Sequence, residues 1–91
     1  MSTAATDEIP TTADPIAVLR EQIDALDTAV IRLIAERARV SQRIQLARLA
    51  SGGTRVELGR ERVVRDGYRA ALGPDGTVLA DAVLRVCRGA R

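Results

Sequence analysis

Ninety-one residues are enough for one domain, but a chain of this length buries only a modest core unless it associates with another copy. With no His and a single Cys, the composition excludes a metal-ligand cluster, a Ser-His or Cys-His nucleophile pair and a disulfide within the subunit. All fourteen basic residues are Arg, whose planar guanidinium binds carboxylates and phosphates through two hydrogen bonds, so the composition favours small anions as ligands.

The first thirteen residues are polar and Thr-rich, and they show no hydrophobic periodicity. We therefore expect a disordered tail over residues 1–13 and a single domain over residues 14–91. The tail lacks the basic end and apolar stretch of a signal peptide, and no apolar run reaches transmembrane length. A cytoplasmic protein is expected.

A long helix is predicted from about Asp14 to Ser51, with Asp14 as N-cap and Pro15 at the first helical position. Its apolar residues recur every three or four positions and form what we call the apolar seam: Ile16, Leu19, Ile23, Leu26, Val30, Leu33, Val40, Ile44 and Ala47. A helix of this length, roughly 55 Å at about 1.5 Å per residue, overhangs any globule that its own chain can form. The seam therefore indicates a two-fold dimer through this helix, with a plain coiled coil as the alternative.

Two shorter helices are predicted after the Gly52-Gly53 turn, from about Glu57 to Leu72 and from about Thr77 to Arg88. Neither is long enough to be stable alone in water, so both should fold back over the pair of long helices. The third helix is expected to bury Val78, Leu79, Val83, Val86 and Cys87. The predicted fold is all-α: a three-helix subunit with one long N-terminal helix, intertwined in a homodimer.

Arg37 interrupts the apolar seam, where an isolated charge is costly. Arg48 returns to nearly the same face of the helix eleven residues later, roughly 16 Å further along, so the two cations converge on a gap the size of a small anion. A polar residue that fixes the register of the seam is the alternative interpretation of Arg37.

Arg20 precedes Arg37 by seventeen residues, roughly 25 Å along a helix, and reaches the same ligand only across an antiparallel helix pair. Its alternative interpretation is a solvated cation. Arg60 and Glu61 begin the second helix just past the turn that follows Arg48, although an ordinary charged helix start explains them equally well.

Four segments together resemble the AroQ-type chorismate mutases in order and spacing over about residues 15–89. The segments are Leu19 to Asp27, Leu33 to Arg37, Ala47-Arg48 and Arg60-Glu61. The stretch from Ala50 to Arg55 is similar to the short actinobacterial subgroup of that family. The resemblance implies a dimer with two equivalent sites, each built from both chains.

The resemblance also implies the roles of the site residues. Arg20 of one chain, with Arg37 and Arg60 of the other, would hold the two carboxylates of chorismate, while Arg48 would bind the ether oxygen and Glu61 would accept from the ring hydroxyl. Glu57 falls where the family often has an acidic or apolar residue near that hydroxyl. No cofactor or metal is implied, because the rearrangement of chorismate to prephenate, a step toward phenylalanine and tyrosine, moves no proton.

The last helix departs from the family pattern, with Arg85 and Gly89 where other members place a Ser and a Gln. Members of the subgroup also bind the first enzyme of the shikimate pathway, which makes that enzyme a candidate partner. Other functions remain open: a 4-amino-4-deoxychorismate mutase or an isochorismate pyruvate-lyase of the same fold, and a non-enzymatic helical adaptor. No nucleic acid or membrane is expected as a partner.

Overall fold

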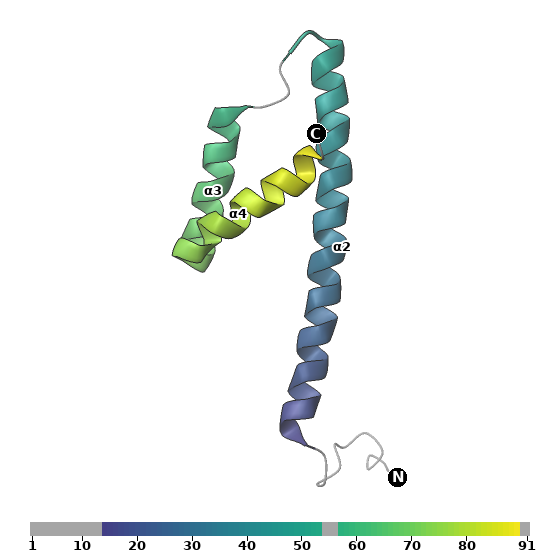
Figure 1. The fold of residues 1–91 in the computed structure, drawn as a ribbon, viewed down its shortest axis with the longest axis vertical. Helices are drawn as coiled ribbons and strands as arrows, with labels where there is room; N and C mark the ends of the chain where they lie inside the picture. Colours follow the sequence, from purple (N-terminus) through teal and green to yellow (C-terminus); the bar gives the residue numbers. More distant parts are fainter. Residues whose placement is uncertain (1–13, 54–56, 90–91) are drawn as a thin grey trace, which may run out of the picture. The chain divides into compact units, whose positions relative to one another are not determined.

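The protein is built from helices. The computed structural model describes residues 14–53 and 57–89, and within these ranges it contains three α-helices and no strand (Figure 1). They are α2 (Pro15–Ala50), α3 (Leu58–Leu72) and α4 (Pro74–Arg88). This confirms the predicted all-α class, while the expected disordered tail lies outside the described residues. None of these helices is long and apolar enough to cross a membrane.

The chain divides into two compact units, Met1–Ile31 and Arg32–Arg91, and α2 contributes residues to both. The described part of the first unit is the N-terminal part of α2, preceded by its cap. The second unit contains the rest of α2 together with α3 and α4.

Both ends of α2 are capped as the sequence indicates. Asp14 accepts a hydrogen bond from the backbone N–H of Ile16 at 2.9 Å, which satisfies one of the free donors of the first turn. At the other end Gly52 adopts a positive φ of 86°, and its N–H donates to the carbonyl of Leu49. The N–H of Gly53 reaches back to the carbonyl of Arg48 at 2.7 Å, completing a Schellman motif that ends the helix.

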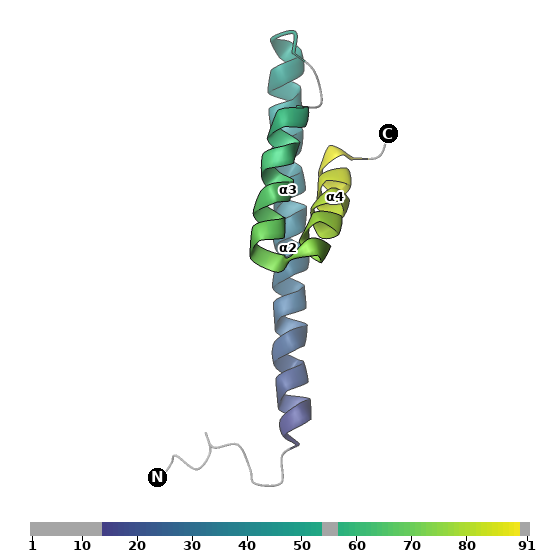
Figure 2. The ribbon, with the colours of Figure 1, turned by 90° about the vertical axis from the view of Figure 1, so that its left-hand side faces the viewer.

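Helices α3 and α4 pack against each other (Figure 2). A single residue, Gly73 with φ 83°, ends α3 and precedes α4, and Pro74 occupies the first turn of α4. A Cβ atom added to Gly76 would lie 2.2 Å from the backbone oxygen of Tyr68, so only glycine permits this close approach of the two helices. Further along the pair, Arg65 Nε lies 3.8 Å from Asp81 Oδ1.

The prediction for the third helix needs two corrections. The helix begins at Pro74 and not near Thr77, because Gly73 alone makes the turn and proline is favoured at a first helical position. Its buried face carries Gly76, Ala80, Val83, Leu84 and Cys87. The expected burial of Val83 and Cys87 is confirmed, but that of three others is wrong, since exposed fractions are 67% for Val78, 45% for Leu79 and 55% for Val86.

The physical reason lies in the small side chains of α4. Gly76 and Ala80, four residues apart, let the helix lie close to α3, and they fix which face turns inward. Val83, Leu84 and Cys87 follow on that face at spacings of three, one and three. The sequence prediction counted only large apolar residues, and it therefore selected the neighbouring face with Val78, Leu79 and Val86.

No residue of α2 is buried within the single chain. The large side chains of the apolar seam are each between 42% and 65% exposed. Burying one Leu, Ile or Val side chain fully stabilises a protein by about 1.5–3 kcal/mol. Covering this seam would therefore add substantially to the free energy of unfolding.

The contact at Gly76 makes a direct test of the α3–α4 packing. Gly76→Ala should destabilise the protein by about 3 kcal/mol, because the methyl group meets backbone that cannot move aside. Gly59→Ala is the matched control, since nothing lies within 4 Å of its added methyl group and alanine is the better helix former. Thermal unfolding measures both, and equal melting temperatures for the two variants would contradict the packing described.

Candidate functional site

A cleft of about 410 Å³ lies in the second unit, lined by side chains from the C-terminal half of α2, from Glu57 and α3, and from α4. The volume is in the range of small-molecule sites, about 300–1,000 Å³. Six of its lining residues are charged: Arg37, Arg48, Arg60 and Arg88, with Glu57 and Glu61. Four arginines against two glutamates give the lining a formal charge of +2.

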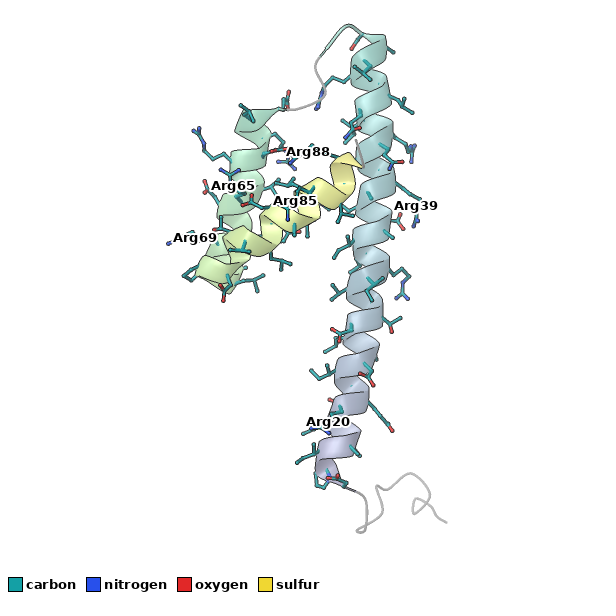
Figure 3. The ribbon with its side chains drawn as sticks, viewed as in Figure 1. Arg20, Arg39, Arg65, Arg69, Arg85 and Arg88 are labelled. Carbon is teal, nitrogen blue, oxygen red and sulfur yellow. The ribbon has the colours of Figure 1, made fainter. Side chains whose placement is uncertain are left out.

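Helix α2 supplies one polar face to the cleft. Arg37, Ser41, Gln45 and Arg48 follow one another at spacings of four, four and three residues, which keeps them on one side of an α-helix. Ser41 and Gln45 were not singled out from the sequence, although their spacing from Arg37 was a usable signal. Arg39 lies on the side of α2 turned away from α3 and α4, where it pairs with Glu36 at 3.5 Å (Figure 3).

Arg48 is held at the end of α2 by the local backbone. It lies in the last turn of the helix, and its carbonyl accepts from the N–H of Gly53. A Cβ on Gly53 would lie 2.7 Å from Arg48 Cγ, so the absence of a side chain there leaves room for the arginine stem. Its Nη2 lies 3.6 Å from Glu57 Oε1, across the turn between α2 and α3.

Glu61 is the more enclosed of the two glutamates in the cleft. Its carboxylate accepts a hydrogen bond from Arg88, and the two form an ion pair in which the exposed fractions of the side chains are 17% for Glu61 and 34% for Arg88. Figure 3 shows Arg88 at the C-terminal end of α4, reaching toward α3. This arginine joins the cleft although sequence reasoning did not select it, since 27 residues separate it from Glu61.

Five of the six residues proposed from the sequence line this cleft: Arg37, Arg48, Glu57, Arg60 and Glu61. Arg37 is partly buried, as are Arg48 and Glu61, whereas Arg60 and Glu57 are exposed. Arg20 is not among the lining residues; it lies in the first unit and is exposed (Figure 3).

The described residues contain no group of three or more His, Cys, Asp or Glu side chains that could hold a metal ion. What the cleft offers is a set of cations in a half-enclosed space, with two carboxylates to accept hydrogen bonds. Guanidinium groups bind carboxylates through two parallel hydrogen bonds, and they stabilise negative charge that develops on a neighbouring oxygen. These are the requirements of a site that binds a small dianion.

Comparison with known proteins agrees with this chemistry. Residues 19–89 match the family model described as chorismate mutase type II. The chain is 50% identical over 74 residues to the intracellular chorismate mutases of Mycobacterium tuberculosis and Mycobacterium bovis, covering 81% of this chain and 70% of those proteins. It is 49% identical over 71 residues to that of Mycolicibacterium smegmatis, covering 78% and 68%.

A solved structure also matches, with a TM-score of 0.78, 36% identity, and coverage of 84% of this chain and 92% of the other. It is a non-covalent complex of DAHP synthase and chorismate mutase from Corynebacterium glutamicum with a bound transition state analog. The chain belongs to the type II chorismate mutase family. This confirms the family inferred from the four sequence segments.

The close contact at Gly53 can be tested against its neighbour. Gly53→Ala should lower chorismate turnover about tenfold or more with little loss of stability, because Gly53 has no positive φ and the new methyl group displaces Arg48. Gly52→Ala should instead lose about 1–2 kcal/mol of stability, since its φ is 86°, and keep most of its turnover. Steady-state kinetics and thermal unfolding of both variants measure this, and unchanged turnover in Gly53→Ala would contradict it.

Proposed function

We propose that this chorismate mutase rearranges chorismate to prephenate in the cleft of the second unit, and that Arg20 of a second copy completes that cleft. The observation that carries the proposal is the gathering of Arg37, Arg48 and Arg60 around one cavity with Glu61. These residues come from separate segments of the sequence, and the resemblance to the family implies a substrate-binding role for each.

The roles follow the charges of the substrate. Arg37 and Arg60, with Arg20 of the partner subunit, bind the two carboxylates and hold the flexible dianion in its reactive conformation. Arg48 donates to the ether oxygen, where negative charge builds as that bond stretches. Glu61 accepts a hydrogen bond from the ring hydroxyl. Glu57, which pairs with Arg48 in this structure, orients that arginine.

The reaction explains why a chain without His suffices. The rearrangement is pericyclic and occurs in one step, so no proton is transferred and no covalent intermediate forms. The protein contributes by placing a cation at the ether oxygen and by holding the dianion in the reactive orientation. A donor at a developing negative charge is typically worth about 3–4 kcal/mol, which is about 100- to 1,000-fold in rate.

The second copy is supported by the exposed apolar seam. The large side chains of this seam are between 42% and 65% exposed in the single chain. Pairing with the same seam of another chain would bury them. Arg20 enters through the same pairing, because one helix cannot bring residues seventeen apart to the same small ligand. We propose an intertwined homodimer with two equivalent sites.

We also propose a place in the synthesis of phenylalanine and tyrosine, and DAHP synthase as a partner. The supporting observation is that the matched Corynebacterium glutamicum chorismate mutase was determined in complex with that enzyme. Family membership decides against a non-enzymatic adaptor.

Arg48 supplies the sharpest test of the proposed mechanism. Arg48→Gln should lower kcat by about 100-fold or more while changing KM far less, because its main partner is charge that appears in the transition state. The control is Arg39→Gln, which removes an arginine from the opposite side of α2 and should keep both constants. Equal losses in kcat and KM on Arg48→Gln, measured by the decrease in chorismate absorbance, would contradict this role.

A further inference from the structure

The ion pair between Arg88 and Glu61 places a fourth arginine in the cleft, at the carboxylate proposed to accept the ring hydroxyl. Arg88 comes from the last turn of α4 and Glu61 from the first turn of α3, so the packing of these two helices creates the pair. Both side chains are more than half buried, which lowers the screening of their charges by water.

We infer that Arg88 is a specificity-determining residue that makes the cleft select a neutral ring substituent, a hydroxyl, over a cationic one, an ammonium. This inference rests on the proposed function, because it concerns the same substrate position. Such a preference would discriminate chorismate from its 4-amino-4-deoxy analogue, two substrates that the same fold can rearrange.

The first argument concerns Glu61 alone. A carboxylate without a nearby cation accepts from a hydroxyl, but it binds an ammonium more strongly, since the hydrogen bond is then assisted by opposite charges. With Arg88 on the same carboxylate, the pair is formally neutral. A hydroxyl keeps its acceptor, because a carboxylate has two oxygens and about four lone-pair positions. An ammonium loses its electrostatic advantage and meets the guanidinium as a like charge.

The second argument concerns the whole cleft. Its lining within one chain carries four arginines and two glutamates, a formal charge of +2, and the proposed Arg20 of the partner subunit raises this charge to +3. Chorismate has a charge of −2, whereas the amino analogue with a protonated amine has a net charge of −1. The excess of positive charge therefore favours the dianion, and Arg88 supplies one of these positive charges.

The chain offers a matched control in a second ion pair between the same two helices. Arg65 of α3 faces Asp81 of α4 at 3.8 Å, with exposed side-chain fractions of 40% and 48%, and neither residue lines the cleft. Figure 3 labels Arg65 beside α3 and Arg88 at the end of α4. Removing either arginine breaks one α3–α4 pair, but only Arg88 takes a charge out of the cleft.

The experiment measures kcat/KM for chorismate and for 4-amino-4-deoxychorismate at pH 7 with the wild-type protein and three variants. In Arg88→Gln the preference for chorismate, the ratio of the two kcat/KM values, should fall by about tenfold. Arg88→Lys keeps the charge and should keep most of the preference. Arg65→Gln should keep it within twofold.

The wild-type protein provides a second measurement that no folding defect can affect. Raising the pH until the amine of the analogue deprotonates should increase its kcat/KM relative to that of chorismate, since the like charge is removed. An unchanged preference in Arg88→Gln, an equal fall in Arg65→Gln, or a flat pH profile of the relative rates would overturn the inference while wild-type turnover of chorismate persists. Loss of that turnover in the wild-type protein would overturn the proposed function itself.

Discussion

The apolar seam of α2 is the constraint on which the rest of the molecule depends. Among the described residues of one chain the buried hydrophobic side chains all belong to α4, and α2 has no buried residue along its 36 positions. A helix that exposes so many Leu, Ile and Val side chains loses about 1.5–3 kcal/mol for each one that stays in water. In the proposed dimer, pairing with a second copy would recover that stability and would bring Arg20 to the cleft of the partner subunit.

The same helix supplies much of the proposed site, because its polar face lines the cleft together with residues of α3 and α4. Arg37 and Arg48 lie on that face, and the glycine pair after Ala50 both ends the helix and leaves space for Arg48. Glu57 and Arg60 follow directly at the start of α3. A short segment of chain therefore assembles most of the cleft, and α4 adds Arg88. The site works by charge and orientation, so a composition rich in arginine and free of His is sufficient for the reaction proposed.

Helix boundaries were predictable wherever a cap or a glycine marks them. Asp14 and the Gly52-Gly53 pair define α2 as expected, and Gly73 ends α3. The exception is the start of α4, which was expected near Thr77 although Gly73 and Pro74 mark it. The inward face of α4 could not be predicted, because it depends on a tertiary contact, the approach of Gly76 to the backbone of Tyr68. Arg37, Arg48, Arg60 and the two glutamates were found through spacing and family resemblance. Neither spacing nor family resemblance indicated Arg88, because its partner Glu61 is 27 residues away and only the packing of α3 on α4 brings the two together.

Mixed dimers test the shared site most directly. Arg20→Ala and Arg37→Ala proteins, each nearly inactive, are combined under conditions where subunits exchange, with exchange verified by mass spectrometry. In a mixed dimer one site collects both substitutions, whereas the other has an intact Arg20 from one chain and an intact Arg37 from its partner. With equal amounts and random exchange, about half of the dimers are mixed and each has one working site, so about a quarter of wild-type activity should return. Complete exchange without any return of activity would show that Arg20 does not complete the partner's cleft.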